Sequence, residues 1–178
     1  YSGANQAALG LISPTLIQSD DPKIYWEFYI EGGSVGGASG GRLGNGIAVP
    51  QFNGGTGSGF YGAGGESAFF YRGTMYDNGA TSVSGFTTAP VGGIQQMAFE
   101  PSTGKVWIGV DGTWRNGAGT SGTTLDESNP DDQLTVQDYV FTMGANRSSD
   151  IGVMNFGDNP TMSGNITAGG NADGNGHG

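Results

Sequence analysis

The stretch GKVWIGVDGTWRNG, residues 104–117, predicts a β-hairpin and is the most informative part of the chain. Every second residue over 106–110 is a β-branched aliphatic side chain, which is typical of a strand with one buried face. Asp111 and Gly112 form a dipeptide that tolerates the positive φ angles of a two-residue turn, and residues 113–115 supply a short return strand. The hairpin carries Trp107 and Trp114, which we expect to pack in the core because a strand tryptophan buries a large area.

Composition favours an all-β domain. The 178 residues are enough for one domain with a sizeable core. Glycine contributes 37 residues and charged side chains only 12%, as expected for a β protein with many turns and long loops. A formal net charge of −10 opposes binding to nucleic acid or anionic membranes. No apolar run approaches the roughly 18 residues of a membrane-spanning helix, and the chain has no cysteine for disulfide or thiolate chemistry.

The clearest single strand is KIYWEFYIE, residues 23–31, in which large apolar side chains alternate with polar or amphipathic ones. One face consists of Ile24, Trp26, Phe28 and Ile30. The opposite face consists of Tyr25, Glu27, Tyr29 and Glu31. We expect the first face to be buried.

Shorter patterns predict the remaining strands. They lie at 47–49, on both sides of the Arg72–Gly73 turn within 67–76, weakly at 81–86, and at 94–100, 136–143 and 151–156. Residues 1–22 predict two short strands joined by a turn, because Gly10 and Pro14 interrupt their apolar positions. The glycine-rich stretches 32–46 and 51–65 and the acidic stretch 120–132 are predicted loops.

Four motifs, in this order, resemble the SPRY domain, a β-sandwich with concanavalin-like jelly-roll architecture, in the form found in bacteriophage virion proteins. They are KIYWEFYI at 23–30, GIAV at 46–49, AFEPSTGKVWIGVDGTWRNG at 98–117 and MNFGDNP at 154–160. The resemblance implies an all-β, antiparallel β-sandwich. The residues that it marks as defining the fold are Trp26, Trp107, Asp111, Gly112, Trp114, Asn155, Phe156 and Gly157.

The chain also departs from the family pattern. The glycine-rich insertion at 32–46 and the loop at 118–132 are longer than the compact family form. After residue 160 the family continues with aromatic and apolar residues, whereas this chain runs into Gly and Asn. We therefore expect one SPRY-like domain over 1–160 and a Gly/Asn-rich tail over 161–178, which is either truncated or completed by a neighbouring chain.

The sequence predicts no catalytic residues. Glycosidases of concanavalin-like architecture place paired carboxylates on one strand in the pattern Glu-x-Asp-x-x-Glu, which is absent here. Glu27 and Glu31 share a strand face but stand four residues apart. The only histidine, His177, is next to the last residue, so a Ser-His-Asp arrangement is implausible. The glycine patterns do not follow the strand-to-helix context of a phosphate-binding loop. We predict that the protein is not an enzyme.

Two groups of oxygen-bearing side chains are candidates for a structural Ca²⁺ ion, although neither has a recognised ligand spacing. The first group consists of Asp126, Glu127, Asp131 and Asp132. The second group consists of Asn171, Asp173 and Asn175. The alternative for the first group is a solvated acidic loop. No other cofactor is indicated.

Aromatic residues in or beside the glycine-rich loops are candidates for ligand binding, because aromatic rings stack on the apolar faces of sugars. These candidates are Phe52, Phe60, Tyr61, Phe70, Tyr71 and Tyr76. The alternative is that most of them pack in the core or in an interface.

These observations predict a non-enzymatic structural or adhesive module of a phage virion, such as a fibre, appendage or surface decoration, that contacts proteins or host glycans. The expected partners are copies of the chain, other virion or surface proteins, and glycans, and the expected location is the virion or the cell exterior. An alternative is a carbohydrate-binding module or bacterial cell-surface adhesin. A glycan-cleaving enzyme is the third and least supported interpretation.

Overall fold

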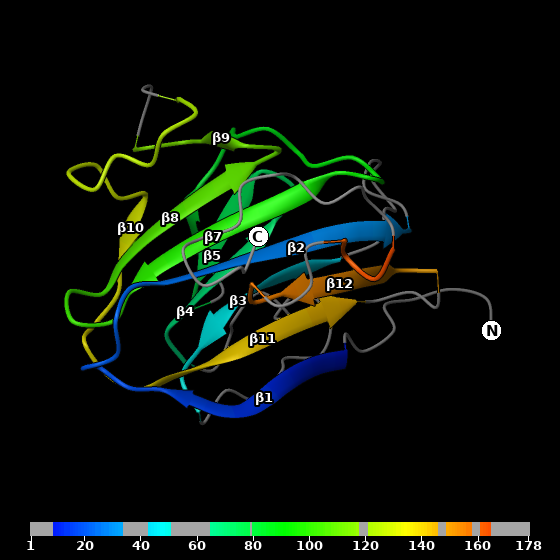
Figure 1. Cartoon of the computed structure of the whole chain (residues 1–178). Coiled ribbons are helices and arrows are strands. Elements are labelled where there is room, and N and C mark those ends of the chain that lie inside the picture. Colours follow the sequence, from blue (N-terminus) through cyan, green and yellow to red (C-terminus); the bar gives the residue numbers. More distant parts are fainter. Residues whose placement is uncertain are drawn as a thin grey trace.

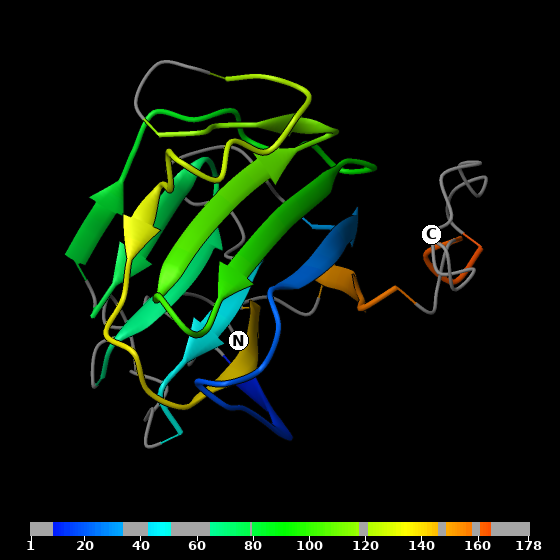
Figure 2. The same ribbon diagram turned by 60° about the vertical axis from the view of Figure 1, so that its left-hand side comes forward.

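The structure is a computed structural model that describes residues 9–33, 43–50, 65–78, 80–117, 121–145, 149–157 and 161–164. Two antiparallel sheets face each other as a β-sandwich (Figures 1 and 2). The first sheet has the order β1 (Leu9–Ile17), β11 (Tyr139–Ala145), β3 (Gly44–Ala48), β4 (Ser67–Tyr71), β5 (Thr74–Asp77) and β6 (Ala80–Val83). The second has the order β10 (Asp132–Gln133), β8 (Lys105–Val110), β7 (Ile94–Glu100), β2 (Ile24–Gly32) and β12 (Ile151–Asn155), and β9 (Thr113–Trp114) also pairs with β8. The prediction of an all-β antiparallel sandwich is confirmed.

The predicted hairpin is formed by β8 and β9. Asp111 and Gly112 have φ angles of 49° and 79°, as a two-residue turn with two positive φ values requires. On β8, Val106, Ile108 and Val110 point into the space between the sheets. Trp107 lies on the other face of the same strand, where it is fully buried by a different group of side chains.

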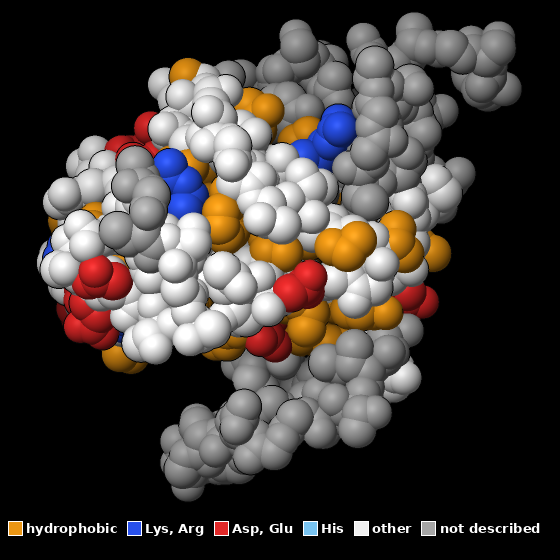
Figure 3. Space-filling model, turned by 90° about the horizontal axis from the view of Figure 1, so that it is seen from above, with side chains coloured by type: hydrophobic (Ala, Val, Ile, Leu, Met, Phe, Trp, Pro, Cys, Tyr) orange, Lys and Arg blue, Asp and Glu red, His pale blue; other side chains and the backbone are white. Residues whose placement is uncertain are grey.

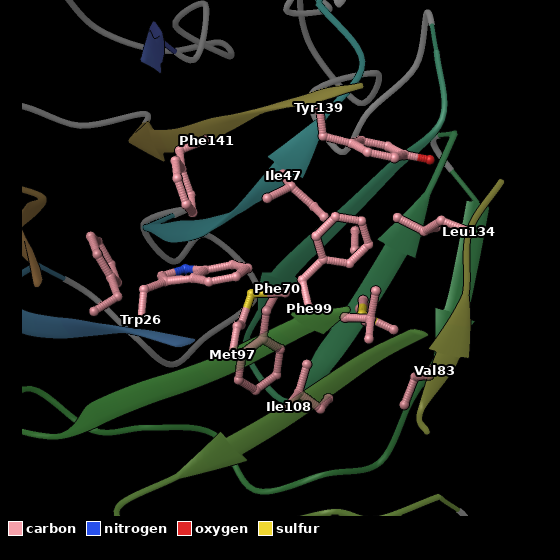
Figure 4. Close-up of a cluster of buried hydrophobic side chains, with 14 of the residues drawn as sticks. Trp26, Ile47, Phe70, Val83, Met97, Phe99, Ile108, Leu134, Tyr139 and Phe141 are labelled. Carbon is pink, nitrogen blue, oxygen red and sulfur yellow. The ribbon is translucent and has the colours of Figure 1, made fainter. Parts of the chain in front are cut away.

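The main core fills the space between the sheets (Figure 4). Trp26 and Phe28 of β2 are fully buried, which confirms the predicted apolar face of this strand. The Trp26 ring contacts Phe141 of the opposite sheet edge to face, with centroids 5.2 Å apart, and Phe99 contacts Tyr139 in the same way at 5.3 Å. Such edge-to-face pairs stabilise the fold beyond the burial of their apolar area, and they favour one arrangement of the two sheets.

A buried polar chain also joins the two sheets. The Nε1–H of Trp26 donates to Oδ1 of Asn45 at 2.7 Å, and Nδ2 of Asn45 donates to Oε1 of Gln95 at 2.7 Å. Asn45 lies on β3 of the first sheet, whereas the other two residues lie on β2 and β7 of the second. All three side chains are buried, so these hydrogen bonds are protected from water.

The N-terminal prediction was wrong in one respect. Residues 9–17 form one strand, β1, paired with β11, and not two strands joined by a turn. The pairing register shifts between Ile12 and Leu16, and Pro14 falls within this irregularity. A β-bulge accommodates a residue that has no N–H for the ladder, so the proline interrupts the pairing without ending the strand.

Most of the other described strands follow the predicted pattern, with Arg72 and Gly73 forming the β4–β5 turn at positive φ. Two differ: β3 begins at Gly44, within the predicted loop 32–46, and β10 was not predicted. A turn at 161–164 stands to one side of the sandwich, beyond the end of β12 (Figure 2). The rest of the tail, including Asn171, Asp173, Asn175 and His177, lies outside the described residues. The described part of the chain contains no helix that is long and apolar enough to cross a membrane.

Candidate functional site

The outer face of the second sheet carries a group of aromatic, amide and carboxylate side chains on neighbouring strands. The ladder places Tyr25 opposite Ala98, and Glu27 opposite both Gln96 and Asn155. Side chains directly opposite in an antiparallel pair project from the same face and interact. Because Trp26 and Phe28 point inward, the alternating residues of β2 point outward.

Tyr25 is the exposed centre of this group. Its side chain is 43% exposed, whereas its aromatic neighbour Trp114 is 8% exposed. The two ring centroids lie 5.9 Å apart with an interplanar angle of 58°. The Tyr25 hydroxyl accepts a hydrogen bond from Nε2 of Gln96 at 2.9 Å and donates one to Oε1 of Glu27. Packing against Trp114 and the two hydrogen bonds of the hydroxyl therefore hold the Tyr25 ring in a fixed position, with part of the ring exposed to solvent.

The hairpin turn fixes Gln96. Oε1 of Gln96 accepts from the backbone N–H of Gly112 at 2.7 Å, while its Nε2 donates to Tyr25. Asp111 ties the same turn to β7, because its Oδ1 accepts from the N–H of Ile94 at 2.7 Å. The turn that the sequence predicted thus also orients a side chain of the candidate site.

Glu27 is held from its other side by the end of β12. Nδ2 of Asn155 lies 3.4 Å from Oε2 of Glu27, and Oδ1 of Asn155 accepts from the N–H of Gly157 at 2.9 Å. Gly157 has a φ of 103°, which favours glycine. Phe156 between them is 50% exposed and packs on Phe141 with ring centroids 4.6 Å apart. The Asn-Phe-Gly motif therefore closes β12 and also supports the Glu27 carboxylate.

We call Tyr25, Glu27, Gln96, Trp114 and Asn155 the Tyr25 platform. Burial of its hydroxyl raises the pKa of Tyr25 well above the ordinary value of 10.0; the hydrogen bond from Gln96 lowers it, and the Glu27 carboxylate raises it further. Tyr25 therefore remains a neutral phenol that donates to Glu27 throughout the physiological pH range.

A second apolar cluster lies beside the platform. Trp107 packs there with Ala98, Trp114 and Leu125, and its Nε1–H donates to the backbone oxygen of Asp126 at 2.9 Å. The described part of the 121–131 segment thus lies over the outer face of the β8–β9 hairpin (Figure 1). Trp26, Trp107 and Trp114 are all buried, as predicted for core tryptophans.

The four acidic residues of the loop have separate structural partners. The side chain of Asp131 has no exposed surface, and it accepts from Nη1 of Arg115 and the N–H of Gly117, both at 2.9 Å, and from the N–H of Ile108 at 2.8 Å. Asp126 accepts from the hydroxyl and N–H of Ser128 and from Asn129.

Glu127 pairs with Lys23. Oδ1 of Asp132 accepts from the N–H of Gln133 at 2.8 Å, and its Oδ2 is buried with no hydrogen-bond partner in the described structure. Within the described ranges, no three His, Cys, Asp or Glu side chains are grouped so that they could hold one metal ion. The structural Ca²⁺ ion stays a prediction.

The candidate ligand-binding aromatics that the structure describes, Phe70, Tyr71 and Tyr76, do not belong to the Tyr25 platform. Phe70 is fully buried in the main core, so it is a core residue with no ring surface for a ligand. Tyr71 and Tyr76 pack with Phe69 in a separate cluster on the first sheet. Phe52, Phe60 and Tyr61 lie outside the described residues.

The alternation of residues 23–31 predicted that Tyr25 and Glu27 lie on the outward face of β2, but it indicated no role for Tyr25. The signal was present, because an exposed tyrosine two residues from a glutamate on a strong strand marks an amphipathic surface. Gln96 and Asn155 carried no such signal. Their roles depend on pairing between strands far apart in the sequence.

Neither protein-family models nor curated proteins match this chain. Among solved structures, it is similar to the crystal structure of a human SPRY domain, with 14% sequence identity, coverage of 88% of this chain and 89% of that chain, and a TM-score of 0.49. It is also similar to the SPRY domain of human HERC1, with 15% identity, coverage of 83% and 79%, and a TM-score of 0.41. Both of these structural neighbours are SPRY domains.

Proposed function

We propose that the protein is a non-enzymatic contact module of a bacteriophage virion, within a fibre, an appendage or a surface decoration, located on the virion or outside the cell. The virion setting rests on the resemblance of four sequence motifs to SPRY domains of phage virion proteins. The chain's partners are other virion or surface proteins, or copies of itself. A multimeric assembly would convert weak single contacts into firm attachment through avidity.

The observation that carries the contact role is the exposed and fixed ring of Tyr25. Tyrosine is enriched at protein interfaces because it offers a large, amphipathic contact area. A side chain already held in one position loses little conformational entropy when a partner binds. Tyr25 pairs with Ala98 of β7, and β2 is also paired with β12 from Glu27 onward, so the backbone that carries the ring is held in the sheet.

Three features support binding rather than catalysis. Glu27 is hydrogen bonded by Tyr25 and Asn155, which fits a structural acceptor. Tyr25 is kept neutral and is not activated as a base. The chain lacks the Glu-x-Asp-x-x-Glu pattern of the glycosidases with concanavalin-like architecture.

A carbohydrate-binding module or bacterial adhesin is the second candidate. The observation that favours it is the exposed aromatic ring beside a carboxylate, because a pyranose stacks on such a ring and its hydroxyls donate to such an acceptor. Specific glycan binding by the isolated monomer would favour this candidate over the virion module.

The proposal is tested by purifying the native particle that contains the chain and measuring its mass by light scattering, with peptide mapping of the chain. We expect a fixed number of copies in a large assembly. A monomer that joins no particle would contradict the virion role. Glycan turnover that disappears in Glu27→Ala, with the fold retained, would contradict the non-enzymatic role.

A further inference from the structure

We infer that the Tyr25 platform binds a cationic side chain, lysine or arginine, from an extended segment of a partner protein. This inference rests on the proposed contact function and specifies the chemistry of the partner. It is carried by the exposed ring, by the adjacent carboxylate and by the charge of the surrounding surface.

The hydrogen bonding of Tyr25 suits its ring to a cation. A cation over an aromatic face is attracted by the negative potential of the ring. The Tyr25 hydroxyl donates to the Glu27 carboxylate, and this contact pushes electron density toward the ring. A cation above the ring would also lie near Glu27, so the two attractions would act together.

The charged side chains around the platform also favour a bound cation, because the carboxylates of β2 are not neutralised by nearby basic side chains of the described structure. Along β2 the outward carboxylates are Glu27 and Glu31, and the chain as a whole carries a formal charge of −10. Among the described residues, the basic side chains next to these strands are Lys23 before β2, Lys105 on β8 and Arg115 after β9, and each has a partner. Lys23 pairs with Glu127, Nζ of Lys105 lies 3.5 Å from the Glu127 backbone oxygen, and Arg115 pairs with Asp131. Seen from above, hydrophobic, acidic and basic side chains all lie on this face of the molecule (Figure 3).

The same chemistry already operates inside the chain. The ammonium of Lys23 lies 5.3 Å from the ring centroid of Trp107 and pairs with Glu127. A cation, an aromatic ring and a carboxylate therefore already occur together on this face of the sheet. At Tyr25 the described structure supplies the exposed aromatic ring and the carboxylate, and the partner would supply the cation.

Ring geometry favours a cation over a glycan at this place. Successive sugars need a broad, flat aromatic surface, but Tyr25 and Trp114 are tilted by 58° and Trp114 is 8% exposed. A single exposed tyrosine offers one small face, which suits a guanidinium or ammonium group.

The position of Glu31 indicates the spacing of the basic residues. Glu31 is exposed and follows Glu27 by four residues along β2, which corresponds to about 13 Å at the rise of a β-strand. An extended partner segment with basic residues four positions apart would match this distance. One basic residue would occupy the Tyr25 platform, and the second would approach Glu31.

The test is an NMR titration of the full ¹⁵N,¹³C-labelled chain at low salt with the capped peptide RGSGR, its neutral counterpart QGSGQ, and cellohexaose. We expect RGSGR to shift the signals of Tyr25 and its neighbours and QGSGQ to leave them in place. Tyr25→Ala should weaken RGSGR binding about two- to fivefold, the range for one exposed cation–π contact. Added salt should weaken it further.

Glu27→Gln removes the negative charge of the platform but keeps the shape of the side chain, so it tests whether that charge contributes to binding. We expect it to weaken RGSGR binding, whereas Asp138→Asn, the same charge change at an exposed residue preceding β11, should have a smaller effect. Equal effects of the two variants, or equal shifts from RGSGR and QGSGQ, would overturn the inference. If the chain bound cellohexaose but not RGSGR, and Tyr25→Ala abolished the cellohexaose binding, the ligand of the platform would be a glycan and not a cation. The contact role of the platform would then still hold. The proposed function itself is tested by a different experiment, the measurement of the native particle, and it fails if the chain is found in no assembly.

Discussion

The polar chain through Asn45 gives a quantitative test of how the two sheets are joined. The Asn45 side chain accepts from Trp26 and donates to Gln95, with both distances 2.7 Å. Asn45 and Trp26 have no exposed surface, and Gln95 is 1% exposed. Replacing Asn45 with alanine leaves the indole N–H and the Gln95 amide oxygen without partners in a buried environment.

The expected loss follows from these two groups. A buried donor or acceptor that loses its partner costs about 1–3 kcal/mol, so Asn45→Ala should lower the free energy of unfolding by about 2–6 kcal/mol. Urea unfolding followed by far-UV circular dichroism measures this loss from the transition midpoint, provided that the slope is unchanged. Asn129→Ala is the matched control, because Asn129 is exposed and donates to Asp126 on the surface; it should cost much less.

A double mutant separates the network from simple loss of volume. Gln95→Leu removes the orphaned amide oxygen, so Asn45→Ala combined with Gln95→Leu should lose less than the sum of the two single variants. A loss below about 1 kcal/mol for Asn45→Ala, or strict additivity in the double mutant, would refute the reasoning, because either result would mean that the buried hydrogen bonds contribute little.

Four further predictions follow from the packing and the charges. Trp107→Ala should cost about 3–5 kcal/mol and should increase amide hydrogen exchange in the 121–131 segment that Trp107 anchors; unchanged exchange would contradict that anchoring role. Gly46→Ala should be more damaging than Gly112→Ala in thermal melts, because a Cβ at Gly46 would overlap a backbone carbonyl of β4, whereas at Gly112 it meets only open space and the cost is the positive φ; the reverse order would contradict the close β3–β4 approach. Burial and neighbouring carboxylates raise the pKa of Asp77, so Asp77→Asn should stabilise the fold at pH 7 by an amount that shrinks as the pH falls toward 3.8. Burial alone would raise the pKa of Glu66, but hydrogen bonds from Thr135, Tyr139 and Gln137 outweigh it and lower the pKa. Glu66→Gln should therefore destabilise the fold at pH 7, and this effect should disappear on acidification. Melting curves at several pH values test both variants; if Asp77→Asn and Glu66→Gln changed the melting temperature in the same direction at pH 7, the assigned pKa shifts would be wrong.

Local patterns predicted most of the strands because their side chains alternate between core and surface. KIYWEFYIE showed which face of β2 is buried, and the Asp111–Gly112 dipeptide placed the hairpin turn. At β1 the same reasoning failed, because a proline that usually ends a strand can also occupy a bulge when the neighbouring strand continues. Sequence alone does not reveal whether β11 runs alongside.

The candidate site was less accessible to sequence reasoning for the same physical reason. Tyr25 and Glu27 are two residues apart, so their common face was predictable. Gln96 and Asn155 complete the platform from β7 and β12, which meet β2 only after the sheet has formed. Phe70, proposed as a ligand contact, lies on the inward face of β4, because proximity to a glycine-rich loop does not determine which way a strand residue points.

The central claim is that the outer face of the second sheet is the contact surface, and site-specific photocrosslinking tests it most directly. A benzophenone amino acid would replace Tyr25 in one sample and Asp138 in another, each within the native assembly, followed by mass spectrometry of the crosslinked peptides. We expect position 25 to crosslink to a lysine- or arginine-containing segment of a partner and position 138 to form no such crosslink. Crosslinks from position 138 with none from position 25 would contradict the claim.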